Sequence, residues 1–193
     1  MLTKSDLIRL LTDAKTYGSR YPKIKQYNVF SMSTISFSVD KQVAWKLGQN
    51  KEPNVWDNIR MAKGRILHEY IQTRLPPSYQ FEIEILLPIP YKWTNHPFHE
   101  ILLLGHIDVI NFKEREILEI KTSEYSNAIK DYHLIQASLY WLYYKIIRDE
   151  NFEIHIAKLG SGLVFRTLSN YEKEHYAHLG IENALAVAKR LDV

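Results

Sequence analysis

The chain has 193 residues, of which 46% are hydrophobic and 24% charged, a composition typical of a globular protein with one ordinary domain. The absence of cysteine excludes disulfides, thiolate metal sites and cysteine nucleophiles. A net charge of +3 neither requires nor excludes nucleic acid, because a local basic face decides such binding. No hydrophobic run approaches the ~18 residues of a membrane helix, and the N-terminus lacks a signal-peptide pattern. We therefore expect a cytoplasmic protein without a membrane partner.

The N-terminal part of the chain is predicted to contain three helices. Residues 3–15 begin with a capping Thr or Ser and form a short helix. Residues 33–48 form a second helix, which Gly48 ends. Residues 54–75 form a long third helix, which stops before Pro76 because proline cannot donate the next backbone hydrogen bond.

Three strands are predicted next. Residues 79–87 carry hydrophobic side chains at every second position, which indicates a strand, and this strand is expected to end at Pro88. Residues 102–123 contain two alternating runs joined by a charged turn, which is the pattern of a β-hairpin.

The C-terminal part alternates again between helix and strand. Residues 126–150 form an amphipathic helix without Gly or Pro. Residues 151–159 and 162–168 form a strand pair separated by Gly-Ser-Gly, and residues 169–191 form a last helix with a capping Ser or Asn. This order of elements predicts an α/β fold with a mixed central β-sheet flanked by helices.

The hairpin carries charged residues among its hydrophobic ones. Residues two apart on a strand share a face, so Glu119 projects with Lys121, and His106 projects with Asp108. A turn of two or four residues would place Asp108 opposite Glu119 and His106 opposite Lys121, whereas a three-residue turn would shift the register by one. An even-length turn would therefore bring the two carboxylates together.

Two adjacent carboxylates repel each other unless a cation neutralises them. Oxygen ligands favour a hard divalent ion such as Mg²⁺ or Mn²⁺. Lys121, beside the carboxylates, could hold a water or stabilise developing negative charge. These are the parts that hydrolysis of a phosphodiester needs. The alternative is that Asp108, Glu119 and Lys121 form a solvated ion-pair ladder on an exposed sheet face.

The order of several motifs resembles one nuclease superfamily. "GHIDVI" followed by "EILEIKTS" resembles the PD-(D/E)XK signature, and Gly105 gives it the G-x-x-D form of the RecB-like branch. Upstream, "GRILHEY" resembles the helical motif of that branch through Gly64 and His68. Downstream, "QASLYWLYY" resembles its Q-x-x-x-Y motif through Gln136 and Tyr140.

This resemblance implies a restriction-endonuclease-like core and a set of site residues. Asp108 and Glu119 would bind the metal ion, the carbonyl of Ile120 would complete its shell, and His68 would be a further ligand from the helix. Lys121 would be the catalytic lysine.

Some assignments stay open within the resemblance. Glu69 is an alternative ligand to His68, because some archaeal Holliday junction resolvases of the superfamily use an early helical Glu. Adjacent helical residues point ~100° apart, so His68 and Glu69 are not expected to bind one ion equally well. Gln136 and Tyr140 lie one helical turn apart and would hold the catalytic lysine or a DNA phosphate, or merely form a polar stripe. His106 would line the site.

The chain departs from the CRISPR-associated and AddB-type relatives in one respect. Those proteins often carry four cysteines that bind an iron–sulfur cluster, and residues 33–48 resemble the segment that holds the first of them. Asp40 and Lys41 stand there instead, so no iron–sulfur cluster is expected.

These observations together predict a magnesium-dependent deoxyribonuclease with DNA as its partner. Residues 1–193 would form one nuclease domain, with its motif-bearing core at about 54–168, helices before it and a C-terminal packing helix after it. The expected activity is that of a RecB-like exonuclease or single-strand nuclease in DNA replication, repair or recombination. The alternatives are a homodimeric, structure-specific endonuclease of the Holliday-junction-resolvase type, a non-catalytic DNA-binding module with a nuclease fold, and a structural protein with an incidental acidic pair.

Overall fold

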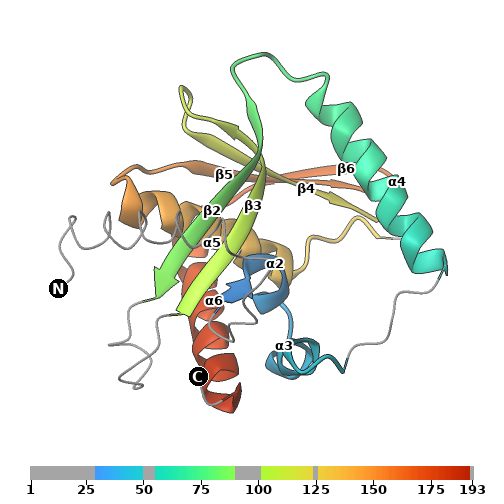
Figure 1. Ribbon diagram of the computed structural model, residues 1–193. Coiled ribbons are helices and arrows are strands. Elements are labelled where there is room, and N and C mark those ends of the chain that lie inside the picture. The colour runs from blue at the N-terminus through green and yellow to red at the C-terminus, as the bar shows by residue number, and fades with distance from the viewer. Residues whose placement is uncertain (1–28, 50–54, 90–100, 124–125, 192–193) are drawn as a thin grey trace.

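The computed structural model describes residues 29–49, 55–89, 101–123 and 126–191 (Figure 1). A six-stranded sheet lies at its centre, in the order β1-β3-β4-β5-β6, with β2 paired to β3. The strands are β1 (Val29–Ser31), β2 (Gln80–Ile89), β3 (Ile101–Asn111), β4 (Glu116–Thr122), β5 (Glu153–Leu159) and β6 (Leu163–Thr167). The helices are α2 (Met32–Ile35), α3 (Val39–Lys46), α4 (Val55–Gln72), α5 (Asp131–Ile147) and α6 (Asn170–Leu191).

The sheet is mixed, as the order of elements predicted. β2 and β4 run antiparallel to β3, and β6 runs antiparallel to β5, whereas the β1–β3 and β4–β5 pairs are parallel. Parallel neighbours need a crossover connection, and α5 supplies it between β4 and β5. Helices α2, α5 and α6 gather beside the sheet, and α4 lies apart from them, near the far end of β4 (Figure 1). The predicted α/β fold class is therefore confirmed.

The core lies between the sheet and helices α5 and α6. The α5 residues from His133 to Trp141 are all buried, as the hydrophobic character of this helix requires. Gly180 of α6 lets the two helices approach closely, because a Cβ atom there would lie 3.0 Å from side-chain atoms of Ile135 and Leu139. Helix α5 thus lies in contact with both the sheet and α6. No helix in the described part of the chain is both long and apolar enough to cross a membrane.

The N-terminal elements differ from the prediction. The helix expected at residues 33–48 is broken into α2 and α3, because Ser38 accepts a hydrogen bond from the amide of Lys41 and begins a new helix. The strand β1 was not predicted, since its three residues are too few to show alternation; it pairs with residues 102–104 of β3. The helix predicted at residues 3–15 lies outside the described residues.

The prediction that the first long strand ends at Pro88 was wrong. Strand β2 continues to Ile89, and Pro88 pairs with Leu102 of β3. Within the described residues β2 pairs with β3 alone, so it lies at an edge of the sheet. Proline is tolerated on an edge strand because its missing N–H can face away from the neighbouring strand.

The hairpin turn has the even length that the site requires. Residues 112–115 connect β3 to β4, and the register runs from Val109 opposite Leu118 to Asn111 opposite Glu116. The side chain of Asn111 accepts hydrogen bonds from the amides of turn residues 113 and 114, at 3.1 and 3.2 Å. Asp108 and Glu119 are the next residues along the two strands, one residue beyond the last pair of this ladder.

Candidate active site

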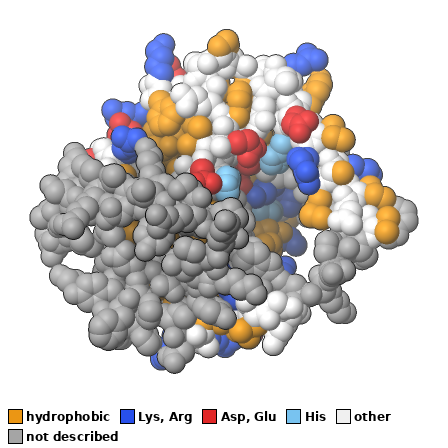
Figure 2. Space-filling view, in the orientation of Figure 1, with side chains coloured by type: hydrophobic (Ala, Val, Ile, Leu, Met, Phe, Trp, Pro, Cys, Tyr) orange, Lys and Arg blue, Asp and Glu red, His pale blue; other side chains and the backbone are white. Residues whose placement is uncertain are grey.

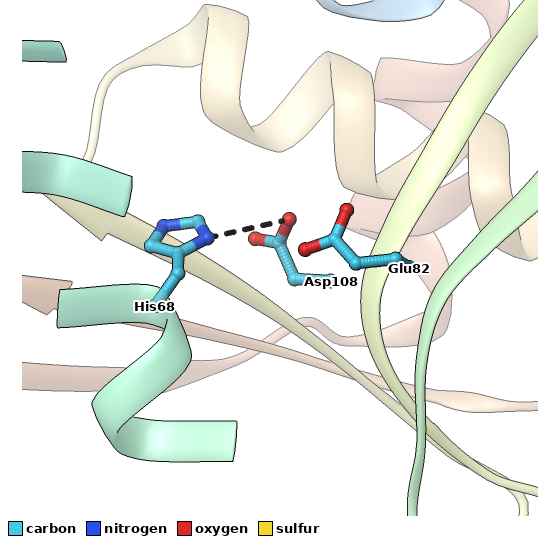
Figure 3. Close-up of side chains that lie close together, drawn as sticks. All are labelled: His68, Glu82 and Asp108. Atoms are coloured by element: carbon cyan, nitrogen blue, oxygen red, sulfur yellow. Dashed lines mark ion pairs between the residues drawn. The ribbon is translucent and has the colours of Figure 1, made fainter. Parts of the chain in front are cut away.

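Side chains from a helix and two strands converge beside the hairpin. One ligand atom from each of His68 on α4, Glu82 on β2 and Asp108 on β3 lies within 4.8 Å of the other two. Figure 3 shows the three side chains pointing toward one another, and Nδ1 of His68 is 3.8 Å from Oδ1 of Asp108. An imidazole nitrogen and carboxylate oxygens make a donor set that can hold a divalent metal ion.

Close approach of α4 to the sheet brings His68 to this position. Gly64 lies one turn before His68, and a Cβ atom there would be 3.0 Å from Oγ1 of Thr122 on β4. Any larger residue would therefore move the helix or the threonine. Glu69, the alternative ligand, is exposed and does not belong to the cluster of His68, Glu82 and Asp108.

The carboxylate of Asp108 is fixed between β3 and β4. The amide of Ile120 donates a hydrogen bond to Oδ2 of Asp108 at 2.7 Å. This contact lies just beyond Val109–Leu118, the last backbone pair of the β3–β4 ladder. Asp108 is also 9% exposed, so it is shielded from most of the solvent. The Oδ2 atom of Asp108 thus satisfies a strand amide, while its Oδ1 atom faces His68.

Glu119 is fully buried close enough to Asp108 for their charges to interact, but it is not one of the three residues of the cluster. The ammonium of Lys121 forms an ion pair with its Oε1 atom. Even so, neither carboxylate oxygen of Glu119 accepts a hydrogen bond of regular geometry from the described residues. A buried carboxylate with so few donors is costly in free energy, and a bound cation would remove much of that cost.

The metal-free site holds its acidic protons tightly. Burial raises the pKa of Glu119 well above the usual carboxyl range, and the negative charge of Asp108 raises it further. Burial likewise raises the pKa of Asp108. Burial lowers the pKa of Lys121, but attraction to Glu119 and Asp108 outweighs that effect and the pKa is raised. One lysine therefore does not supply enough positive charge for two buried carboxylates.

A chain of hydrogen bonds positions Lys121. Its Nζ donates to Oε1 of Gln136 at 2.9 Å, and Nε2 of Gln136 donates to the hydroxyl of Tyr140. The hydroxyl of Tyr140 donates in turn to the carbonyl of His106 at 2.8 Å. The three hydrogen bonds all run in one direction, from Lys121 toward the carbonyl of His106, and Tyr140 is fully buried. Gln136 and Tyr140 thus fix the ammonium next to Glu119.

His106 contributes its backbone to the site, not its ring. Its side chain is exposed, and Nε2 lies 3.4 Å from Oε2 of Glu84 on β2. The expected pairing of His106 with Lys121 is absent, because the β3–β4 ladder ends at Val109–Leu118. The ring of His106 therefore lies beside an acidic residue of the edge strand.

Sequence reasoning missed Glu82. The neighbouring pairs Phe81–Val109 and Ile83–Ile107 place Glu82 level with Asp108, but its φ of 52° interrupts the regular strand. This left-handed conformation is uncommon for a residue other than glycine. The alternation of residues 79–87 did put Glu82 on the polar side of the strand, but only the β2–β3 register shows which residue it faces.

The comparisons with known proteins support the fold. No protein-family model matches the chain, and no curated protein matches it. Among solved structures it is similar to SSO0001, with a TM-score of 0.57 and 14% identity over 91% of this chain and 85% of that one. It is also similar to the "Putative exonuclease" of Eubacterium rectale, with a TM-score of 0.57 and 10% identity over 85% of this chain and 82% of that one. The chain therefore shares its overall fold with these two structures.

Proposed function

We propose that the chain is a metal-dependent nuclease that hydrolyses phosphodiester bonds in DNA. The observation that carries this proposal is the buried pair of Asp108 and Glu119 with Lys121 held against it. Such a pair is costly in a protein that has no use for it, because two buried carboxylates repel each other. The fold similarity to a protein named as an exonuclease is a second, weaker support.

The residues of the site fit a divalent ion such as Mg²⁺ or Mn²⁺. Asp108 and Glu119 would hold it, with His68, Glu82 and the carbonyl of Ile120 as further ligands. The buried oxygens of Glu119, which accept no regular hydrogen bond from the described residues, and the carboxylates clustered with His68 are the donors that such an ion prefers. When bound, the ion would polarise a phosphate and make a water molecule easier to deprotonate.

The residues around the ion each have a part in this proposal. Lys121 would stabilise the negative charge that develops on the phosphate, because its ammonium is already fixed and needs little reorganisation. Gln136 and Tyr140 would keep that ammonium in place. With the cation bound, Asp108 and Glu119 would stay ionised at neutral pH.

The RecB-like exonuclease or single-strand nuclease is the form of this activity that we favour. His68 lies in the cluster, as the motif of that branch implies, whereas Glu69 is exposed. A dimeric junction resolvase with an early helical Glu as ligand therefore has less support. A non-catalytic DNA-binding module has less support as well, because the Asp, Glu and Lys of the signature are all present. The activity would serve DNA replication, repair or recombination.

The direct test is cleavage of labelled single-stranded, duplex and four-way-junction DNA. We expect cleavage with Mg²⁺ or Mn²⁺, none with EDTA, and none in the isosteric variant Glu119→Gln. The exposed substitution Glu174→Gln is the matched control and should cleave like the wild type. Absence of cleavage of all three substrates with either ion would overturn the proposal. Degradation that persists in Glu119→Gln would point to a contaminating nuclease.

A further inference from the structure

Two lysines face each other across β4 and β5. Lys121 and Lys158 are direct partners in the parallel register of these strands. Like charges on partnered strand residues destabilise a sheet unless an anion lies between them. Glu119 neutralises Lys121 from the side of the carboxylate cluster. Strand β4 lies between β3 and β5 in the sheet. Lys158 on β5 and the carboxylate of Asp108 on β3 therefore lie on opposite sides of β4.

Within the described part of the chain, Lys158 is a buried cation without an acidic partner. It is 3% exposed, and its Nζ donates one hydrogen bond, to the carbonyl of Ala128 at 2.7 Å. No carboxylate of the described residues forms an ion pair with it. Asp131, at the start of α5, is exposed and instead accepts a hydrogen bond from Tyr176. Burial lowers the pKa of Lys158, and the charges of Lys130 and Lys121 lower it further.

His133 adds a neutral donor to these lysines. It is 4% exposed, and its Nδ1 accepts a hydrogen bond from the amide of Lys130 at 3.1 Å. The neutral ring therefore carries its hydrogen on Nε2, where it can donate. Burial lowers the pKa of His133, and the nearby charges of Lys121, Lys158 and Lys130 lower it further. The positive charges of three lysines thus act on His133.

We propose that Lys121, Lys158 and His133 form a phosphate-binding subsite. It would hold a phosphate group of the DNA strand next to the one being hydrolysed, and it rests on the proposed function. Ammonium groups and an N–H donor are suitable partners for phosphate oxygens, and a partly enclosed site strengthens their attraction to the anion. Figure 2 shows basic and histidine side chains beside acidic ones around a hollow in the surface. Lys121 would link the subsite to the metal-binding carboxylates.

A purely structural role of Lys158 predicts a different result. Its hydrogen bond to Ala128 holds the segment that leads into α5. If this were its only role, substitution would lower stability but leave the electrostatic part of DNA binding unchanged. The electrostatic part can be measured separately from stability. On a single strand, each phosphate that the protein neutralises adds roughly 0.7 to the slope of log K against log salt concentration.

The test is the salt dependence of oligonucleotide binding, measured by fluorescence anisotropy in EDTA so that the strand is not consumed. Lys158→Gln should reduce the slope by roughly 0.7 and weaken binding, and Lys158→Arg should keep the wild-type slope. Lys113→Gln, on the exposed hairpin turn, is the control and should change neither. Thermal unfolding shows whether each variant is folded. An unchanged slope in folded Lys158→Gln would overturn the subsite.

A second measurement uses the wild type, so its result does not depend on whether Lys158→Gln folds. Inorganic phosphate, titrated into protein with labelled histidines, should shift the ring signals of His133 and leave those of His155, on the same strand as Lys158, unchanged. A His133 signal that does not move would overturn the subsite. Oligonucleotides with a 5′-phosphate, a 3′-phosphate or neither distinguish the source of the group. Tighter binding of one phosphorylated end identifies a terminal phosphate, and equal affinities identify a backbone phosphate.

The two proposals fail in different ways. If the wild type cleaves DNA but Lys158→Gln binds with the wild-type slope, the subsite is wrong and the nuclease proposal stands. If the wild type does not cleave any DNA but phosphate shifts His133 and Lys158→Gln lowers the slope, the anion-binding subsite stands and hydrolysis is wrong.

Discussion

The carboxylate of Asp108 accepts a hydrogen bond from the amide of Ile120 at 2.7 Å, where the backbone pairing of β3 with β4 has ended. The side chain thus does two things that different substitutions can separate. Its oxygen satisfies a buried strand amide, and its negative charge belongs to the metal-binding cluster.

Asp108→Asn and Asp108→Ala should therefore behave differently. The Asn variant keeps an oxygen that can accept from the Ile120 amide and loses the charge, so it should lose metal affinity without losing stability in EDTA. The Ala variant leaves the amide unsatisfied and should be less stable by about 1–3 kcal/mol. Calorimetric titration of Mn²⁺ and urea unfolding in EDTA measure the two effects. Equal Mn²⁺ affinity in wild type and Asp108→Asn would contradict the assignment.

The stability of the metal-free protein should fall as the pH rises. The pKa of Asp108 is raised to about 6 and that of Glu119 to about 8, whereas both groups titrate near 4 in the unfolded chain. A carboxyl group with a raised pKa binds its proton more tightly when folded, so its stabilising effect is full below pH ~4 and is lost as the pH passes through the raised value. Urea unfolding in EDTA between pH 4.5 and about 8 tests this.

The isosteric variant Glu119→Gln supplies the control for that pH dependence. It cannot ionise at this position, so its stability should change less over the same pH range. Saturating Mn²⁺ should reverse the trend in the wild type, because the ion binds the ionised carboxylates. A wild-type free energy of unfolding that rises with pH in EDTA would contradict the raised pKa values of the two carboxyl groups.

Lys121 should matter for rate more than for metal binding. Loss of one well-placed charge-stabilising group costs about 10²–10³ in rate, and we expect a loss of this size in Lys121→Gln. Tyr140→Phe should give a smaller loss, since it removes the hydroxyl that orients Gln136 but keeps the ammonium. Single-turnover cleavage separates these effects from product release. A Lys121→Gln enzyme at the wild-type rate would reduce Lys121 to part of an ion pair.

His68 and Glu69 are a matched pair of neighbours on α4. His68 faces Asp108, and Glu69 is exposed. His68→Ala should weaken Mn²⁺ binding at least about tenfold, since even residues behind a metal ligand change affinity by 10–100-fold. Glu69→Ala and His106→Ala should change it little. If Glu69→Ala weakened Mn²⁺ binding and His68→Ala did not, the resolvase-type site would be the better assignment.

Gly64 tests whether the position of α4 matters for activity. Gly64→Ala should favour the helix by about 1 kcal/mol, but its Cβ would lie 3.0 Å from Oγ1 of Thr122 and push α4 outward. Because a misplacement of 1 Å can cost about 10²-fold in rate, we expect reduced cleavage in a protein of normal stability. Thr122→Ala removes that oxygen and should restore cleavage in the double variant. No rescue would mean that Gly64 acts in another way.

The hairpin shows how far the sequence could be interpreted alone. Its alternation and charged turn predicted that Asp108 would lie opposite Glu119 if the turn had an even length, and the four-residue turn of the structure meets that condition. The order of helices and strands likewise gave the fold class. These features depend on neighbouring residues or on one pairing of adjacent strands.

The features that could not be predicted depend on contacts between distant segments. Glu82 joins the cluster through the β2–β3 register and a left-handed conformation, and a local pattern contains neither. Lys158 meets Lys121 only after a helical crossover has set β5 beside β4. The ring of His106 lies beside Glu84 of the edge strand, so an argument from β3 and β4 alone could not place it.

Helix α4 differs from the other parts of the site in how it is held. Asp108 and Glu119 are set in strands of the buried sheet, but His68 belongs to a helix whose Val55, Ile66 and Tyr70 are 71%, 66% and 56% exposed. An ion bound by both would join this helix to the sheet, so metal binding and helix docking would be one equilibrium. The measured affinity would then equal the intrinsic affinity multiplied by the fraction of molecules in which α4 is docked. Amide hydrogen exchange along α4 would slow on adding Mn²⁺, while exchange in β3 would change far less.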